Sequence, residues 1–376
     1  MKKILLLSHS QKSGGAERCL LEAAIGLKKR GYEVTVFMPS DGELNEMLVS
    51  VNISTLVTSY PYWVHKNKVG MGIINKLRSM GSIVKYSLKL LPLIKSLNPD
   101  YVLSNTLCIP CGAIVCKILR KKHVWFIHEF GKEDHNLLFD FGMYLSSKII
   151  CLTSQKIFVN SELVKLKYQK YIKKEKFSII NYNVSKPDVD HELLKIKNRG
   201  FDLFLIGQIV KGKGQMDAIK AVHILFNEGY QLNLLVIGQI SNNDYYKELQ
   251  NYIITNRLTD IVQFINHTAN PFSLIRKFTI GLICSKLEAL GRVTIEYMKS
   301  EIPVIGANAG NTPFLITNNE TGLLYKLKDP EDLANQIKIL IKDDLLVKKL
   351  TRNAKEFANG TFNEENYIDG MIKYLC

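Results

Sequence analysis

Residues 285–296, with the sequence SKLEALGRVTIE, decide the fold of this chain because they join elements of alternating type. The apolar run before them, Thr279 to Cys284, is typical of a buried strand in a parallel sheet. The residues Val293 to Lys299 predict a helix that begins just after Gly291. A second buried strand is predicted at Ile302 to Gly306. Strand, turn, helix and strand in this order predict an α/β fold with a parallel sheet.

The turn between the first strand and the helix predicts an anion site. Free backbone N–H groups and the helix dipole point to the start of the helix, at Gly291 and Arg292. Glu288 lies in the turn, and Glu296 lies inside the helix. Two acceptor-only carboxylates beside a phosphate site suit hydroxyl-rich partners such as a sugar and a ribose. The alternative is a helix with two solvated glutamates, because the spacing E-x7-E is common by chance.

This spacing, with Gly-Arg-Val-Thr inside it, resembles the motif of the retaining glycosyltransferases of family 4. The resemblance implies the GT-B architecture, in which two Rossmann-like domains have parallel sheets that face a central cleft. It implies that Glu288 is catalytic and contacts the transferred sugar, and that Glu296 binds the ribose of the donor. Gly291, Arg292 and Val293 are then expected to lie at the donor as well.

A glycine-rich loop, GQIVKGKG at residues 207–214, follows a predicted strand at Phe201–Ile206. It nearly matches the phosphate loop of NTPases, which leaves a Mg²⁺-dependent ATPase as one hypothesis. Gly214, however, stands where that loop needs a hydroxyl residue to hold Mg²⁺. The loop is more similar to the family-4 pattern Gly-Arg-x4-Lys-Gly, and the resemblance implies that Lys213 neutralises the donor diphosphate during catalysis.

Two positions depart from the family pattern. Gln208, a donor-site position, stands where the family has arginine, so the site loses one charge and a bidentate phosphate contact. Phe314 stands where the family's Gly-Gly-Thr-Pro-Glu turn has glutamate. These departures leave a second hypothesis open, a catalytically weak GT-B subunit or a carbohydrate-binding partner. His267 follows the predicted strand Ile261 to Ile265, where the family contacts the nucleobase, and is a further donor-site candidate.

The first part of the chain predicts a sheet of its own. A strand at Ile4–Ser8 leads to Gly14 and Gly15, whose lack of side chains lets a ligand approach the start of a helix. The sequence Gly-Gly-Ala-Glu-Arg here resembles the cleft loop of the same family, which makes Gly14 and Gly15 donor-site candidates. The alternative is that Gly-Gly merely forms a turn. His128 follows a predicted strand at Val124 to Ile127, at the sheet edge where ligands bind. The resemblance makes His128 a catalytic candidate near the donor sugar, and a purely structural histidine is the alternative.

The length of 376 residues is enough for two domains, each with its own core. We expect an N-terminal Rossmann-like acceptor-binding domain at 1–185 and a C-terminal Rossmann-like nucleotide-sugar-binding domain at 200–360. The resemblance implies that a final helix at 361–376 crosses back to the N-terminal domain. Asp188-Val189-Asp190 matches D-x-D, a metal–nucleotide motif of other glycosyltransferases. It follows Ser185-Lys186-Pro187 rather than an apolar strand, so we interpret it as linker.

Cysteine usage and hydropathy bear on location. Seven scattered cysteines indicate reduced thiols in a cytosolic protein. Cys108, Cys111 and Cys116 are closely spaced, but no second ligand pair completes a metal site, so core thiols are the favoured interpretation. No apolar run reaches the ~18 residues of a membrane span.

The formal net charge of +15 indicates an anionic partner. Between Val64 and Pro99 there are seven Lys/Arg and no Asp or Glu. Apolar residues recur there at three- and four-residue steps: Ile73, Leu77, Met80, Val84, Leu88, Leu91 and Ile94. This pattern is typical of a basic amphipathic helix on an anionic membrane surface. The alternative is that the apolar stripe packs into the N-terminal domain. No motif indicates nucleic-acid binding.

Taken with these features, the resemblance implies an enzyme, a retaining and metal-independent glycosyltransferase of the bacterial cell-surface polysaccharide type. The expected donor is a UDP- or GDP-linked sugar, and no cofactor is expected. The expected acceptor is a saccharide or a lipid-linked saccharide. The protein is expected to be cytoplasmic and peripheral on the inner face of the cell membrane. The donor sugar, the nucleobase, the linkage and the oligomeric state stay open at this stage.

Overall fold

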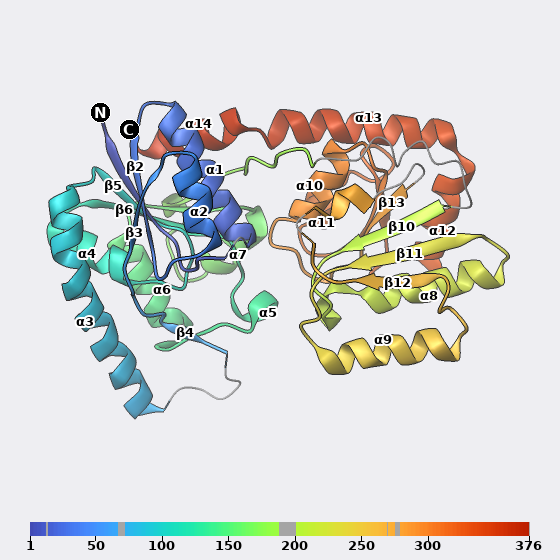
Figure 1. The fold of residues 1–376 in the computed structure, drawn as a ribbon, viewed down its shortest axis with the longest axis horizontal. Helices are drawn as coiled ribbons and strands as arrows, with labels where there is room; N and C mark the ends of the chain where they lie inside the picture. Colours follow the sequence, from blue (N-terminus) through green and yellow to red (C-terminus); the bar gives the residue numbers. More distant parts are fainter. Residues whose placement is uncertain (13, 67–71, 188–200, 269, 275–278, 376) are drawn as a thin grey trace. The chain divides into compact units, whose positions relative to one another are not determined.

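The computed structural model describes residues 1–12, 14–66, 72–187, 201–268, 270–274 and 279–375. The chain forms two compact units, unit 1 with Met1–Asn183 and Asn363–Cys376, and unit 2 with Val184–Phe362. Each unit is built around its own parallel sheet, with helices packed against it (Figure 1). The predicted α/β fold class with two Rossmann-like sheets is therefore confirmed. The motif Asp188-Val189-Asp190 lies outside the described residues.

The sheet of unit 1 has seven parallel strands in the order β3-β2-β1-β5-β6-β8-β9. Their bounds are β1 Lys3–Leu7, β2 Glu33–Met38, β3 Ser54–Val57, β5 Tyr101–Ser104, β6 Lys122–Ile127, β8 Lys156–Val159 and β9 Phe177–Ile179. The chain moves outward from β1 to β3 and then returns to the other side of β1 at β5. The carboxyl ends of β1 and β5 therefore flank a switch point, the place where open α/β sheets bind ligands.

The helices of unit 1 are α1 Gly15–Lys29, α2 Glu43–Ser50, α3 Ile73–Leu97, α4 Cys111–Leu119, α5 Lys132–His135, α6 Gly142–Thr153, α7 Glu162–Tyr168 and α14 Glu364–Leu375, with a short 3-10 helix at Lys174–Lys176. Two short strands, β4 Val64–His65 and β7 Leu138–Phe139, pair antiparallel beside them. The last helix, α14, packs on α1, and the Tyr367 hydroxyl donates to the Cys19 carbonyl over 2.9 Å. A Cβ at Gly26 would lie 2.4 Å from Ile368 Cγ1, so glycine permits this close packing.

The sheet of unit 2 has six parallel strands in the order β12-β11-β10-β13-β14-β15. Their bounds are β10 Phe201–Ile206, β11 Leu232–Ile237, β12 Val262–Ile265, β13 Thr279–Ile283, β14 Val304–Ala307 and β15 Leu323–Tyr325. The helices are α8 Gln215–Asn227, α9 Asn243–Thr255, α10 Arg292–Lys299, α11 Thr312–Leu315, α12 Pro330–Lys342 and α13 Asp344–Thr361, with 3-10 turns at Lys211–Lys213 and Pro271–Leu274. The chain moves outward from β10 to β12 and then returns to the other side of β10 at β13, so that β10 and β13 are neighbours in the sheet.

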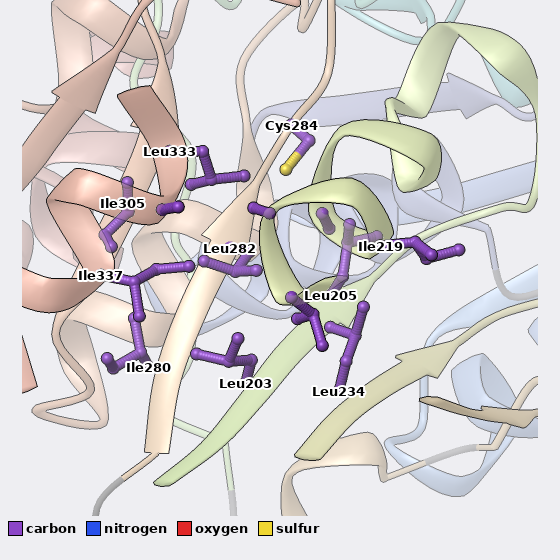
Figure 2. Close-up of a cluster of buried hydrophobic side chains, with 14 of the residues drawn as sticks. Leu203, Leu205, Ile219, Leu234, Ile280, Leu282, Cys284, Ile305, Leu333 and Ile337 are labelled. Carbon is purple, nitrogen blue, oxygen red and sulfur yellow. The ribbon is translucent and has the colours of Figure 1, made fainter. Parts of the chain in front are cut away.

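The core of unit 2 holds these central strands in place. Figure 2 shows side chains from β10, β13 and β14 that meet helices α8 and α12. The labelled members are Leu203, Leu205, Ile219, Leu234, Ile280, Leu282, Cys284, Ile305, Leu333 and Ile337. All are almost fully buried, and each such side chain contributes about 1.5–3 kcal/mol of apolar burial. The loops at the carboxyl ends of β10 and β13 are therefore carried on a rigid base.

The basic stretch predicted as an amphipathic helix is α3, but it buries a different face from the predicted stripe. Ile83, Leu90 and Ile94 are buried, whereas five members of the predicted stripe are exposed: Ile73, Leu77, Met80, Val84 and Leu88. Placing Ile94 on the same face as these five is wrong. A seven-residue spacing drifts by about 20° per heptad around a straight helix, so three heptads move it by about 60°. For the five exposed residues, the alternative that the stripe is core is also wrong.

Candidate active site

The glycine-rich loop after β10 lies against the end of β13. Gly214 has φ +69°, and a Cβ there would lie 2.1 Å from the Cys284 carbonyl oxygen. No larger residue fits without moving backbone, because a contact of that length is far inside van der Waals distance. The amide of Lys286 donates to the Gly212 carbonyl over 2.9 Å. The loop and the turn that follows β13 are thus tied together.

This contact brings two of the predicted catalytic residues together. Lys213 Nζ lies 2.5 Å from Glu288 Oε1, although the residues are 75 positions apart in sequence. The Lys213 and Glu288 side chains are 30% and 18% exposed, so the pair is accessible from one side and shielded on the others. Partial burial strengthens such a pair relative to one on an open surface. The structure therefore places a cation and a carboxylate at one solvent-accessible point.

The start of α10 completes this group. Gly291 precedes the helix with φ +95°, and its Cβ position lies 3.9 Å from Glu288 Cβ. Arg292 and Val293 are the first two helical residues, at positions whose amides an α-helix does not use for its own hydrogen bonds. Arg292 Nε lies 3.2 Å from Glu296 Oε1, one turn along the same helix. Two cations, two carboxylates and a helix start are therefore grouped at the carboxyl ends of β10 and β13.

A second loop, residues 309–313, supports this turn, and it is the segment that resembles the family's Gly-Gly-Thr-Pro-Glu turn. The Asn311 amide donates to the Glu288 carbonyl over 3.2 Å, and its side chain donates to the Leu290 carbonyl over 2.8 Å. A Cβ at Gly310, which has φ +56°, would lie 2.7 Å from the Glu288 amide nitrogen. Asn311 is itself buried. Its position inside the Gly-Asn-Thr-Pro turn was the available signal, because a buried amide after glycine needs backbone partners.

The remaining donor-site candidates of unit 2, Gln208 and His267, are exposed, as is Phe314. Gln208 is exposed, and its carbonyl accepts from Gln215 Nε2 over 2.9 Å. His267 is exposed beyond β12, the edge strand, which is two strands or about 10 Å from β10. Phe314 is exposed in α11. The structure thus groups Lys213 and Glu288 with the start of α10, and it places His267 at the far edge of the same sheet.

His128, the third predicted catalytic residue, is buried in unit 1 with both ring nitrogens in use. Nε2 lies 2.8 Å from Asn105 Oδ1, and Nδ1 contacts the Tyr182 hydroxyl. Asn105 Nδ2 in turn donates to the Ala16 carbonyl over 2.8 Å. Burial lowers the pKa of His128 to about 3, so the ring is neutral at physiological pH. This arrangement links β5, β6 and the start of α1, and a direct contact of His128 with the donor stays a prediction.

A histidine–glutamate pair lies beside the predicted glycines. Gly14 and Gly15 are exposed at the start of α1, and Glu17 lies in its first turn. Glu17 Oε1 lies 2.9 Å from His9 Nδ1, and a Cβ at Gly14 would lie 2.7 Å from Glu17 Oε2. Sequence reasoning includes Glu17 only as part of the Gly-Gly-Ala-Glu-Arg loop and misses His9 and the pairing of the two. The signal was a glutamate in the first turn after Gly-Gly, a position from which a carboxylate can fold back over the helix start.

Burial sets the charge of a further carboxyl group in unit 1. Glu129 accepts hydrogen bonds from the amides of Leu107 and His128, over 3.2 and 3.0 Å. Desolvation nevertheless raises the pKa of Glu129 to about 7. The same effect raises the pKa of Cys111 to about 11 and that of Cys116 to about 12, so these buried thiols stay protonated. Among the described residues, no group of three His, Cys, Asp or Glu side chains could hold a metal ion.

Two sequence families match the chain. Residues 188–357 match the family described as Glycosyl transferases group 1, and residues 13–182 match the family described as Glycosyltransferase Family 4. The capsular polysaccharide biosynthesis glycosyltransferase CapM of Staphylococcus aureus is 27% identical over 238 residues, 60% of this chain and 62% of CapM. The uncharacterized glycosyltransferase MJ1178 of Methanocaldococcus jannaschii is 29% identical over 242 residues, 62% of this chain and 61% of that protein. The match spans about three fifths of the length of both relatives.

Solved structures share the fold along the whole chain. Anabaena Alr3699/HepE, crystallised in complex with UDP and glucose, has a TM-score of 0.80 and 21% identity, covering 100% of this chain and 99% of HepE. A mutant of S. aureus TarM, in a complex that contains UDP, has a TM-score of 0.73 and 14% identity, covering 100% of both chains. At these identities the likeness concerns the fold alone.

Proposed function

Since this chain belongs to the GT-B glycosyltransferases, we propose that it moves a sugar from a UDP- or GDP-linked donor to a saccharide or lipid-linked saccharide acceptor. The observation that carries the proposal is the meeting of Lys213, Glu288 and the start of α10 at one accessible point of unit 2. We place the reaction in bacterial cell-surface polysaccharide synthesis. The similarity to CapM, whose name refers to capsular polysaccharide biosynthesis, supports that assignment.

In the proposed reaction the donor diphosphate leaves toward fixed positive charge. Lys213 Nζ and the first amides of α10 lie where negative charge would develop on the leaving group, and such preorganised charge stabilises the transition state. Glu288 would accept hydrogen bonds from hydroxyls of the transferred sugar, and Glu296 from those of the ribose. We further propose transfer with retention and without a metal ion, since these side chains can neutralise the diphosphate themselves.

Gln208 leaves the proposed donor site with one positive charge fewer than the family pattern has. The arginine expected by the family pattern is replaced by an uncharged, exposed side chain. Lys211 is bound to Glu248 at 3.0 Å and is directed toward α9, so it is a poor substitute. Arg292, at the start of α10 and beside Glu296, is the better candidate to supply the missing charge. We propose that the donor is held by Lys213, Arg292 and the backbone amides of α10.

Nucleotide binding tests the proposal most directly. UDP or GDP should raise the melting temperature of the purified protein, because a ligand that binds only the folded state at 100 times its Kd adds about 2.7 kcal/mol of stability. UDP is the first nucleotide to try, since HepE was crystallised with it. A matching UDP- or GDP-sugar should then be consumed when a saccharide acceptor is present. Mg²⁺-dependent ATP turnover without UDP or GDP binding would contradict the proposal and favour the ATPase hypothesis. Nucleotide binding without sugar transfer would favour the weak-subunit hypothesis.

We also propose that the chain works on an anionic membrane surface, at the cytoplasmic face, through α3. Six apolar side chains of this helix are exposed, from Ile73 to Leu88. Among them lie the exposed cations Lys76, Arg78, Lys85 and Lys89, and no Asp or Glu occurs from Val64 to Pro99. Exposed apolar groups interleaved only with cations complement anionic lipid, where the cations meet headgroups and the apolar groups enter the interface.

A second helix of unit 1 also exposes apolar side chains and a cation. α6 exposes Tyr144, Leu145 and Leu152, together with Lys148, and carries no acidic residue. Both α3 and α6 pack against α4. None of the described helices has the length and apolarity to cross a bilayer. The proposed contact is therefore one in which helices lie on the surface.

Vesicle sedimentation checks the membrane proposal. The wild type should bind vesicles with anionic lipid at low salt, be released by high salt, and bind neutral vesicles poorly. Each cation near the surface is worth about 1 kcal/mol, so changing Lys76, Arg78, Lys85 and Lys89 to glutamine should weaken binding by at least about tenfold. A matched control changes three lysines and one arginine that are exposed in unit 2, Lys342, Lys348, Lys349 and Arg352. Equal loss in both variants, or no binding by the wild type, would contradict a site on α3.

A further inference from the structure

We propose that His9 and Glu17 form a hydroxyl-binding subsite in unit 1, in which His9 accepts a hydrogen bond from an acceptor hydroxyl through Nε2. Glu17 is the positioning residue that fixes the imidazole. This inference rests on the proposed function, because it takes unit 1 as the part that binds the saccharide acceptor. The experiment below separates failure of the subsite from failure of that function.

The position of His9 in the fold is the first argument. His9 comes two residues after the end of β1, at the switch point between β1 and β5. Its backbone is held there, because the Tyr62 hydroxyl donates to the His9 carbonyl and the Ser8 amide donates to the Phe37 carbonyl over 2.9 Å. Ligands of open α/β sheets bind at this kind of point. A side chain fixed here is well placed to contact a substrate.

The orientation of the ring is the second argument. The Glu17 side chain is 5% exposed and its Oε1 lies 2.9 Å from Nδ1, which is the buried nitrogen of His9. The His9 side chain is 27% exposed, and because Nδ1 is buried we infer that the accessible part is the edge that carries Nε2. A carboxylate beside Nδ1 holds the proton on that nitrogen and leaves the lone pair on Nε2. In its neutral form the ring is therefore a fixed acceptor at the switch point, and protonation would turn Nε2 into a donor.

The charges around His9 decide what kind of group it binds. Glu17 from α1 and Glu129 after β6 face the ring, whereas neighbouring His128 is neutral and Tyr62 is protonated. Burial alone would lower the pKa of His9, but the hydrogen bond and charge of Glu17, together with the charge of Glu129, raise it above its ordinary value. Two carboxyl groups disfavour an anionic ligand at this point. A neutral hydroxyl, the group that defines a saccharide, fits the acceptor nitrogen.

Acceptor kinetics of position 9 variants test the subsite. His9→Asn keeps an amide group near the Nδ1 position, where it can contact Glu17, but it removes Nε2. The value of kcat/KM for the acceptor should therefore fall about tenfold, which corresponds to the loss of one hydrogen bond. His9→Gln places an amide near the Nε2 position and should recover part of the loss. The Kd for UDP or GDP should stay unchanged in both variants. The matched control is His135→Asn, since His135 is exposed on α5. The acceptor substrates used in these assays are p-nitrophenyl hexosides.

The pH profile distinguishes the role of Glu17. Because the neutral ring is the acceptor, kcat/KM for the hexoside should fall as the pH drops through the pKa of His9. Glu17→Gln removes the charge that raises this pKa, so the acid limb should move to lower pH, and NMR titration of the His9 Cε1 proton should move with it. If the wild type transfers sugar and His9→Asn does so equally well, the proposed subsite is wrong and the proposed function stands. Absence of transfer and of nucleotide binding in the wild type overturns the proposed function and the subsite with it.

Discussion

Replacing Lys213 by alanine should lower turnover by about 10²-fold or more, the usual cost of removing one preorganised charge from a transition state. The reason is geometric. Lys213 is carried on a loop that Gly214 presses against the end of β13, and its ammonium group lies at the point where the diphosphate is proposed to leave. Steady-state assays with saturating donor measure the effect on kcat. Because the change leaves Glu288 without its partner, the melting temperature of the variant should be measured alongside.

The matched control is Lys211→Ala, two residues earlier in the same turn. Lys211 is 69% exposed and paired with Glu248, so its removal should change turnover by no more than a few-fold. Unchanged kcat/KM in the Lys213 variant would exclude this residue from the site. A large loss in both variants with a lowered melting temperature would indicate a disturbed loop.

The second large effect separates the two glutamates. Glu288→Gln should mainly lower kcat, because its proposed partner is the reacting sugar, and a loss of about 10²-fold is expected for a group that acts in the transition state. Glu296→Gln should mainly weaken nucleotide binding, by about tenfold, because its proposed partner is a ribose hydroxyl. Calorimetric titration with UDP or GDP and steady-state kinetics measure the two effects independently.

The ion pair of Glu296 predicts how the loss of affinity in Glu296→Gln depends on the charge of the ligand. Glu296 is bound to Arg292, so Glu296→Gln also removes the carboxylate that competes for this cation, which partly offsets the loss for an anionic ligand. The loss should therefore be larger for uncharged uridine or guanosine than for the diphosphate. Equal nucleotide affinity in wild type and Glu296→Gln would contradict the assigned roles, as would an unchanged kcat in Glu288→Gln.

Local patterns account for what the sequence predicts correctly. The strand at Phe201–Ile206 is predicted to the residue because a buried parallel strand is a short, mostly apolar run that ends at polar residues or glycine. The helix after Gly291 begins where predicted, since a glycine at positive φ ends the turn before it. The proximity of Glu288 to the helix start follows from short sequence separation alone.

Tertiary packing accounts for what the sequence does not predict. The contact of Glu288 with Lys213 depends on sheet order, because β10 and β13 are neighbours only through a crossover. His9 and Glu17 pair across a loop whose conformation no periodicity describes. The faces of α3 depend on which side meets α4, and an apolar residue count cannot tell a buried stripe from an exposed one that drifts around the same helix.

In the proposed reaction, in which Lys213 binds the diphosphate and Glu288 the transferred sugar, the contact between these two residues has a kinetic consequence. Before the donor arrives, the lysine already has a tethered anion at 2.5 Å, and the same anion is available again once the sugar has been transferred. A nucleoside diphosphate that remains after the reaction must then compete with a carboxylate that never diffuses away. The tethered anion lowers the affinity for donor and product alike, but only the product lacks the sugar that engages Glu288. Release of the nucleoside diphosphate product is thereby favoured, although the charge of Lys213 is unchanged. Product release is often a slow step in enzymes that close over phosphates.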